Sequence, residues 1–181
     1  MASSMTHFTI ITVCFNEAKG IRRTCESVIG QTLGDFEWIV IDGGSNDGTL
    51  DILSEFKERI TCLVSEKDGG IYDAMNKGLG RATGEYVVFM NGGDAFASFE
   101  VLAKVAAAPE SDLIFGDIFF NEVNGERAEF PDILDEGYLL KKMVPHQATF
   151  YRRKLFQQFE NFDTSYRIAA DYDLYVRLLE V

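Results

Sequence analysis

One turn of this sequence places a single carboxylate behind two glycines. The apolar residues 86–90 end abruptly at Asn91, Gly92, Gly93 and Asp94. Glycines keep side chains away from a bulky neighbour, and Mg²⁺ is often held by one or two carboxylates while phosphate and water oxygens complete its shell. Asp94 is therefore a candidate ligand of Mg²⁺ or Mn²⁺. The competing interpretation is a β-turn in which Asp94 caps a helix that starts near Phe99.

Two other carboxylates follow apolar runs in the same way. Asp42 ends the run at residues 36–41 and opens the turn DGGSNDGT, and Asp68 precedes two glycines. A carboxylate at the carboxyl end of a strand can accept hydrogen bonds from the ribose or base of a nucleotide. Asp42 is interpreted as such a contact, whereas Asp68 is left open between a ligand contact and a helix cap. A turn and a helix cap are favoured for the other polar residues of the first turn, which are Ser45, Asn46, Asp47 and Thr49.

The other titratable side chains can each be explained without a catalytic role. Asp73 and Lys77 are four residues apart, which favours a solvated ion pair on a helix surface. His146, in VPHQ, is interpreted as a core or loop histidine, with approach to a phosphate or metal as the alternative. Asp171 and Asp173 stand at the start of a helical pattern, where the helix dipole favours negative charge without any catalytic role.

Alternating strand and helix patterns must position these side chains. Apolar, β-branched runs predict strands at residues 8–15, 36–41, 60–64 and 86–90. Between them, apolar residues at helical spacing predict helices at residues 19–31, 50–56 and 71–79. This order predicts an α/β fold with a doubly wound, Rossmann-like, mostly parallel sheet. Such sheets bind ligands at the carboxyl ends of their strands.

The second half of the sequence predicts further elements around the same sheet. Patterns indicate helices at residues 99–108, 153–159 and 171–179 and strands at residues 113–115 and 147–151. Asn124-Gly125 between alternating segments predicts an appended antiparallel hairpin. We expect one domain over residues 1–181, with residues 1–6 disordered or left over from cloning. The last helical pattern has no terminating Gly, Asn or Pro, which predicts a chain truncated at its C-terminus.

The composition restricts the partners and the compartment. The 181 residues carry 29 acidic and 17 basic side chains, and the formal net charge of −12 repels nucleic acid and anionic membrane surfaces. A small anionic ligand needs a local override, such as a metal ion or a helix N-terminus. The three cysteines are scattered in apolar surroundings, and no apolar run is long enough to span a membrane. A reducing, cytoplasmic location is expected.

The turn after the first strand argues against two nucleotide-binding classes. CFNEAKG stands where a dinucleotide-dependent oxidoreductase carries GxGxxG, so the usual pyrophosphate cradle is missing. The glycine-rich and basic loop of a nucleotidyltransferase is missing from the same place.

Taken together, the motifs resemble family 2 of the glycosyltransferases, nucleotide-sugar enzymes with the fold called GT-A. The likeness extends over residues 8–178 and is carried by ITVCFNEAKGIRRTCESVIGQT, FEWIVIDGGSNDGT, EKDGGIYDAMNKGLGRATGEYVVFMNGGD, HQATFYRR and AADYDLYVRL. The order and spacing of these motifs make the resemblance specific. The form EKDGGIYDAMNKG is especially similar to bacterial enzymes that build cell-surface polysaccharides of the colanic-acid type.

The resemblance implies roles for particular residues. It implies a nucleotide-binding half at about residues 7–94 and an acceptor-side half at about residues 95–181. Asp94 matches the metal-binding region and Asp171 the catalytic base. The candidate donor-binding residues are Phe15, Asn16, Glu17, Asp42, Asp68, Asn76, Asn91, Gly92 and Gly93. The sequence departs from the family pattern at Asn91 and Gly93, where other members carry carboxylates, and this departure weakens the expectation of strict metal dependence.

The function implied by the resemblance is inverting sugar transfer. The expected donor is a nucleotide-diphosphate sugar, with UDP as the expected nucleotide and Mn²⁺ or Mg²⁺ as the cofactor. The expected acceptor is a hydroxyl of a glycan or of a lipid-linked sugar, in the cytoplasm or at the inner face of the membrane, with no nucleic-acid partner. The alternative is an inactive GT-A-like module that binds a nucleotide or a partner.

Overall fold

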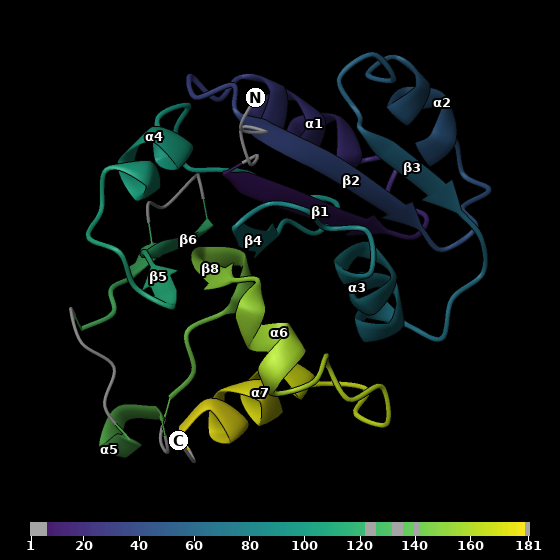
Figure 1. Ribbon diagram of the computed structural model, residues 1–181. Coiled ribbons are helices and arrows are strands. Elements are labelled where there is room, and N and C mark those ends of the chain that lie inside the picture. Colours follow the sequence, from purple (N-terminus) through teal and green to yellow (C-terminus); the bar gives the residue numbers. More distant parts are fainter. Residues whose placement is uncertain (1–6, 122–125, 132–135, 140–141, 180–181) are drawn as a thin grey trace, which may run out of the picture.

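A six-stranded, mostly parallel sheet forms the centre of the molecule (Figure 1). The computed structural model describes residues 7–121, 126–131, 136–139 and 142–179. The strand order is β3-β2-β1-β4-β8-β5, and β8 alone runs antiparallel to its two neighbours. The strands are β1 (Phe8–Cys14), β2 (Phe36–Asp42), β3 (Cys62–Ser65), β4 (Tyr86–Phe89), β5 (Leu113–Phe115) and β8 (Thr149–Arg152). The predicted α/β fold with a mostly parallel sheet is confirmed.

Helices cover both faces of this sheet, as Figure 1 shows. One face carries α1 (Ile21–Ile29), α2 (Thr49–Ser54) and α4 (Val101–Ala106), and the other carries α3 (Ile71–Leu79), α6 (Lys154–Gln158) and α7 (Ala170–Leu179). Short α5 (Glu136–Leu139) and the 3₁₀ turn η1 (His146–Ala148) complete the described helices. No helix within the described ranges is both long and apolar enough to cross a bilayer.

Alternating side chains of each central strand enter two separate hydrophobic clusters. Ile11 and Val13 of β1 pack in the cluster that contains α3, α6 and α7, whereas Ile10 packs in the cluster that contains α1, α2 and α4. Successive side chains of a strand point to opposite faces, and both faces of this sheet are covered. This burial explains why the central strands are mostly apolar and do not alternate with exposed polar residues.

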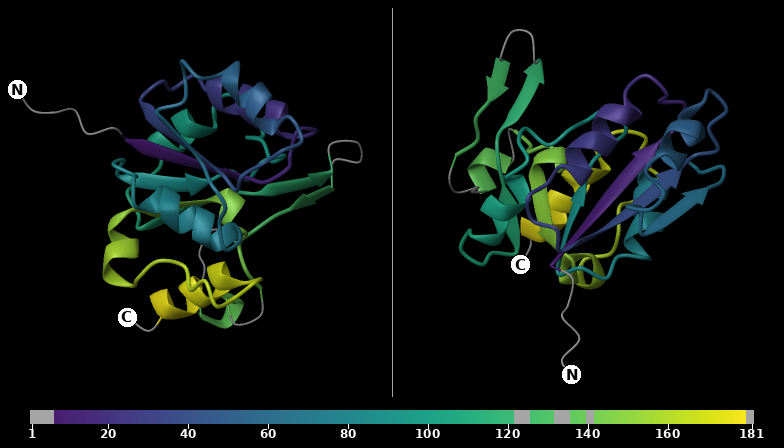
Figure 2. Two further views of the ribbon diagram at one scale, coloured as in Figure 1. Left: turned by 90° about the vertical axis from the view of Figure 1, so that its right-hand side faces the viewer. Right: turned by 90° about the horizontal axis from the view of Figure 1, so that it is seen from above.

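A two-stranded antiparallel sheet, β6 (Ile118–Asn121) with β7 (Glu126–Ala128), is appended to this body. Figure 2 shows it projecting away from the layered part of the molecule. An ion pair between Arg127 and Asp117 holds its base. The hairpin pairing was predicted, while the predicted turn at Asn124-Gly125 lies outside the described residues.

Several predicted element boundaries differ from the observed ones by one or more residues, and two of the differences have a local reason. The first strand ends at Cys14 and not at residue 15, because Asn16 has a φ of 52° and turns the backbone away. Gln147 was predicted to begin a strand, but it lies in η1, where the Ala148 N–H donates to the Pro145 carbonyl at 3.0 Å. The strand begins two residues later, at Thr149.

The turn before β4 makes a close backbone contact that yields a stability prediction. A Cβ at Gly84 would lie 2.7 Å from backbone atoms of Phe8 and Thr9. Because backbone cannot yield cheaply, we expect Gly84→Ala to lower the free energy of unfolding by about 1–3 kcal/mol. Gly80→Ala is the control, since its Cβ would meet carbonyl oxygens only at 3.7 Å. Denaturant unfolding measures both variants, and equal losses would contradict the contact.

Candidate active site

The loop after β2 clamps the loop after β1. Ser45 Oγ accepts a hydrogen bond from the Asn16 N–H at 2.8 Å, Thr49 Oγ1 accepts one from the Glu17 N–H at 2.9 Å, and Asp47 Oδ2 accepts one from the Ala18 N–H at 3.0 Å. Asp47 also accepts from the Thr49 N–H at 3.0 Å, which forms an Asx turn immediately before α2. The N-cap position of α2 is Gly48 and has no side-chain cap, so the predicted helix cap is not formed there. The polar turn therefore fixes the candidate donor-binding residues Asn16 and Glu17.

Asp42 is fully buried at the end of β2, and its carboxylate organises the turn that follows. It accepts hydrogen bonds from the Gly44 N–H at 3.1 Å, the Ser45 N–H at 3.0 Å and the Ser65 hydroxyl at 2.6 Å. Burial opposes its ionisation, but hydrogen bonds from Ser45, Ser65 and Gly44 together lower the pKa of its carboxyl. Its contact with a nucleoside stays a prediction.

Phe15 and Asp68 meet across Gly43. A Cβ at Gly43 would lie 2.7 Å from Asp68 Oδ2 and 3.3 Å from the Phe15 Cβ. The other oxygen of Asp68 accepts from the Gly70 N–H at 2.9 Å, immediately before α3. The Phe15 side chain is 62% exposed, and both residues lie next to Gly43, beyond the carboxyl ends of β1 and β3. This pairing suits a planar base with polar edges.

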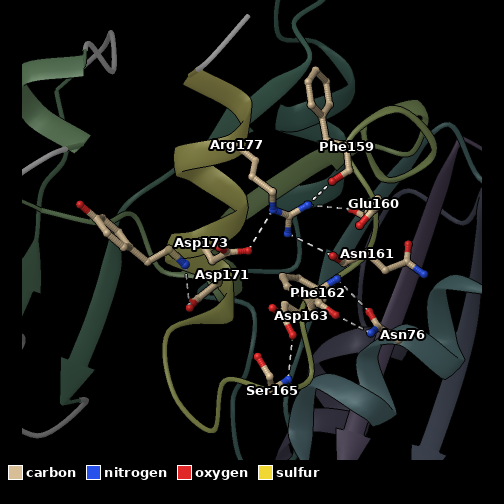
Figure 3. A network of polar contacts seen from close by, with 11 residues as sticks. Asn76, Phe159, Glu160, Asn161, Phe162, Asp163, Ser165, Asp171, Asp173 and Arg177 are labelled. Atoms are coloured by element: carbon tan, nitrogen blue, oxygen red, sulfur yellow. Dashed lines mark hydrogen bonds and ion pairs between the residues drawn. The ribbon is translucent and has the colours of Figure 1, made fainter.

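Asn76 has a structural partner. Its amide nitrogen donates to the Phe162 carbonyl at 2.8 Å, and its oxygen accepts from the Phe162 N–H at 3.1 Å (Figure 3). These bonds attach α3 to the segment before α7. The assignment of Asn76 to the nucleotide site stays a prediction, while its observed contacts hold the backbone together. Asp73 and Lys77, on the same helix, form the predicted ion pair at 3.4 Å.

The turn after β4 is held on β1 and α1. The Gly92 N–H donates to the Val13 carbonyl at 2.8 Å, and the Thr24 hydroxyl donates to the Asp94 carbonyl at 2.7 Å. Gly93 has a φ of 93°, which favours glycine. The space beside Gly92 holds a side chain of the protein itself, since a Cβ there would lie 3.0 Å from the Glu17 Cγ.

Asp94 does not cap α4, which begins at Val101 and has no side-chain cap. Burial raises the pKa of the Asp94 carboxyl, although a hydrogen bond with Gln147 and the charges of His146 and Arg23 act in the opposite direction. A carboxyl whose negative charge is costly to bury is one that a cation would stabilise.

The oxygen atoms at this turn fit a divalent cation. The Asn91 Oδ1 atom is buried and has no hydrogen-bond partner among the residues that the structure describes. Together with Asp94 it offers carboxylate and amide oxygens, the ligands that Mg²⁺ and Mn²⁺ prefer. Among the residues that the structure describes, no group of three His, Cys, Asp or Glu side chains could hold a metal ion, at this turn or elsewhere. Oxygens of the ligand would therefore have to complete the shell.

Asp171 lies in the first turn of α7 and is only 4% exposed. Its Oδ1 accepts from the Tyr72 hydroxyl and the Tyr172 N–H, both at 3.1 Å, and its Oδ2 lies 3.0 Å from His146 Nδ1. Burial opposes ionisation, but His146, Tyr72 and the Tyr172 N–H together lower the pKa of this carboxyl. Asp171 is therefore charged at neutral pH.

His146 connects Asp171 to the turn after β4. The His146 Nε2 atom lies 2.9 Å from the Asn91 amide nitrogen, and its Nδ1 atom contacts Asp171. The sequence favoured a core or loop histidine, and the ring is indeed buried, at 8% exposed. The sequence did not reveal that this ring touches both the candidate metal turn and the candidate base. Tyr72 and Gln147 were likewise absent from the predicted site.

The second acidic residue of α7 has a structural partner. Asp173 accepts from Arg177 Nε at 2.9 Å, and the Arg177 guanidinium also donates to carbonyls of Phe159, Glu160 and Asn161 (Figure 3). These bonds attach the segment before α7 to the helix. Asp173 is therefore held by Arg177, whereas Asp171, at the start of the same helix, lies beside His146.

The hydrogen bonds of Asp42 predict a pH-dependent contribution to stability. Because its folded pKa is lowered, the contribution is present above the unfolded pKa and is lost as pH falls through the folded value. We expect Asp42→Asn to lower the free energy of unfolding by about 1–3 kcal/mol at pH 7. The difference from wild type should shrink below about pH 4. Urea unfolding across pH tests this expectation.

The Ser65→Ala variant is the graded comparison, because it removes one donor from Asp42 and leaves the others. Its loss should be smaller than that of Asp42→Asn and should shrink over the same pH range. A difference for Asp42→Asn that stays constant down to pH 2 would contradict the assigned cause.

Comparison with known proteins places this geometry in a family. A sequence profile described as Glycosyl transferase family 2 matches residues 9–169. The chain is 36% identical over 184 residues to a PGL/p-HBAD biosynthesis glycosyltransferase of Mycobacterium bovis, covering 98% of this chain and 70% of that protein.

Two solved structures share the fold at lower sequence identity. TarS residues 1–349 of S. aureus, in complex with UDP-GlcNAc, superposes with a TM-score of 0.75 at 23% identity, over 94% of this chain and 52% of that one. The mannosyltransferase PcManGT of Pyrobaculum calidifontis, in complex with GDP-Man and Mn²⁺, gives a TM-score of 0.73 at 20% identity, over 95% and 51%. The chain thus spans about half the length of these solved chains. From the profile and the mycobacterial relative it follows that the protein belongs to family 2 of the glycosyltransferases.

Proposed function

We propose that the protein moves a sugar from a nucleotide-diphosphate sugar, with UDP as the expected nucleotide, to an acceptor hydroxyl with inversion at the anomeric carbon. The observation that carries this proposal is the pair of contacts made by His146. One ring nitrogen contacts the candidate base Asp171 and the other contacts Asn91 of the candidate metal turn. The side chain of His146 thus links Asn91, a candidate contact of the nucleotide sugar, to Asp171, the candidate proton acceptor.

The donor side of the proposal rests on the fit of Asp94 and Asn91 to a divalent cation and on the exposed Phe15 beside Asp68. Mn²⁺ or Mg²⁺ bound there would offset the negative charge that develops on the leaving diphosphate. The fold neighbours bind UDP-GlcNAc in one case and GDP-Man with Mn²⁺ in the other. The same class of donor is proposed for this chain, and a bound cation would let an acidic protein hold an anionic ligand.

On the acceptor side, Asp171 is proposed as the general base. An ionised carboxylate can accept about four hydrogen bonds, and this one receives three from the protein. The remaining lone pair can accept the proton of an acceptor hydroxyl while its oxygen bonds to the anomeric carbon and the bond to the diphosphate breaks. Attack from the face opposite the leaving group inverts the configuration.

The proposed setting is bacterial surface glycan synthesis, with a glycan or a lipid-linked sugar as the acceptor. The enzyme would work in the cytoplasm or at the inner face of the membrane, where such acceptors are extended. The projecting β6–β7 pair and the acceptor-side half of the chain would select the acceptor. The competing proposal is a binding module without turnover, which the single carboxylate of the metal turn favours.

Substitution of the two key carboxylates separates these proposals. With a panel of nucleotide sugars and Mn²⁺, we expect wild type to release free nucleotide diphosphate. Asp171→Asn should lower kcat by about 10²–10⁴-fold, because the proton acceptor is lost, while UDP affinity is unchanged. Asp94→Ala should abolish the part of UDP affinity that depends on Mn²⁺. Product release and calorimetry measure these effects.

Asp51→Asn is the matched control, since Asp51 is exposed on α2, away from the candidate residues. It should leave both kcat and UDP affinity unchanged. If wild type releases no nucleotide from any donor and Mn²⁺ does not strengthen UDP binding, the enzymatic proposal fails and the binding module is favoured.

A further inference from the structure

The described contacts of His146 give each ring nitrogen a single role. Asn91 presents its amide nitrogen to Nε2 at 2.9 Å, and an amide nitrogen can only donate. Nε2 must therefore carry the lone pair, and the ring proton lies on Nδ1, which donates to Asp171 Oδ2 at 3.0 Å. Asn91 thus donates a hydrogen bond to His146, and His146 donates one to Asp171.

This polarity also fixes the direction of the Asn91 oxygen. Because the amide nitrogen faces His146, Oδ1 points away from the ring and is left without a partner in the described part of the protein. Rotation of the amide by half a turn would place two hydrogen-bond acceptors against each other, unless the ring proton moved from Nδ1 to Nε2 and the bond to Asp171 were lost. The orientation of the Asn91 amide and that of the Asp171 carboxylate are therefore coupled through one imidazole.

The backbone around His146 is held independently of these two partners. The Ala148 N–H donates to the Pro145 carbonyl at 3.0 Å, and the Thr149 hydroxyl donates to the same carbonyl at 3.2 Å. Thr149 begins β8, which pairs with both β4 and β5 in the central sheet. The imidazole is thus supported by the sheet, while its partners come from a turn and from the start of a helix.

We propose that His146 is a positioning residue that sets two groups at once: the carboxylate of Asp171 toward the acceptor and the amide oxygen of Asn91 toward the donor's diphosphate or its cation. This inference rests on the proposed function, because it acts through Asp171. A histidine that served only packing would need neither partner, and its loss would change stability without separating donor binding from turnover.

Two isosteric substitutions divide the roles of the ring. The amide nitrogen of His146→Asn can occupy the place of Nδ1 and bond to Asp171, whereas the longer side chain of His146→Gln can reach the place of Nε2 and Asn91. We expect His146→Asn to keep kcat within about threefold and to weaken Mn²⁺-dependent UDP binding and raise the donor KM by about 10-fold. His146→Gln should keep UDP affinity and lower kcat by about 10–100-fold.

Calorimetry measures Mn²⁺-dependent UDP binding, which reports on the Asn91 contact and needs no turnover. Steady-state kinetics with the sugar donor measure kcat, which reports on the Asp171 contact. Thr149→Val is the structural control, because it removes a nearby buried hydroxyl that bonds to Tyr175 and the Pro145 carbonyl. It should lower Tm without a split between kcat and KM. In addition, His146→Gln should cause no further loss of kcat in an Asp171→Asn background.

The outcomes separate this inference from the proposed function. If Asp171→Asn retains wild-type kcat, the base assignment fails and the proposed function fails with it. If Asp171→Asn is inactive but the His146 variants change kcat and UDP affinity equally, in step with Tm, His146 has only a packing role. Wild-type values for both His146 variants would also overturn the inference.

Discussion

The parallel pairing of β1 with both β2 and β4 is the constraint on which the site depends. The register joins Phe8 to Phe36 on one side and to Tyr86 on the other, so the three strands start level. β1 and β2 also end level, at Cys14 and Asp42, whereas β4 ends opposite Ile11. The carboxyl-end turns of β1 and β2 must then lie side by side, and the observed bonds between residues 16–18 and residues 45–49 follow from that alignment. A slip in the pairing of β1 with β2 would separate Asn16 from the turn that holds it.

The antiparallel strand β8 extends this alignment to the second half of the chain. Its antiparallel register pairs Val88 with Phe150, so residue 91, three positions after Val88, comes alongside residue 147, three positions before Phe150. The segment before β8 is thereby brought to the turn after β4, and the segment after it continues to α7 and Asp171. The His146 contacts are a consequence of sheet topology as much as of local sequence.

Two fully or nearly fully buried carboxylates of this acidic protein accept several hydrogen bonds from neighbouring backbone and hydroxyl donors. Asp42 receives backbone and hydroxyl donors from one turn, and Glu37, at the opposite end of the sheet, receives them from Thr9, Thr83 and Gly84. At Asp42 burial opposes ionisation, but these hydrogen bonds together lower the pKa of the carboxyl. Asp94 differs, since burial dominates there and raises the pKa of its carboxyl. That difference distinguishes a carboxylate that stabilises the fold from one suited to a cation.

Periodicity and turn chemistry predicted the sheet and the positions of its turns, because continuous apolar runs and glycine-rich turns reflect burial and backbone geometry directly. The role of Asp171 could not be derived in this way, since a carboxylate at a helix start is explained by the helix dipole alone. It entered as an expectation from the resemblance. Sequence reasoning favoured a core or loop role for His146 and did not identify Tyr72. His146 contacts Asn91 across 55 positions of the sequence, and Tyr72 contacts Asp171 across 99. No local pattern encodes such contacts.

The amide at position 91 and the imidazole next to it are chemically matched. A carboxylate at position 91 would present only acceptors, so it could accept a hydrogen bond from His146 only if Nε2 carried a proton. With Nδ1 also donating to Asp171, the ring would then be a cation between two carboxylates. Asn91 can donate instead, which leaves Nε2 unprotonated and keeps the proton on Nδ1 for Asp171. An amide at position 91 thus adds no negative charge to this turn, leaves Oδ1 without a protein partner in the described residues and keeps the contact with His146.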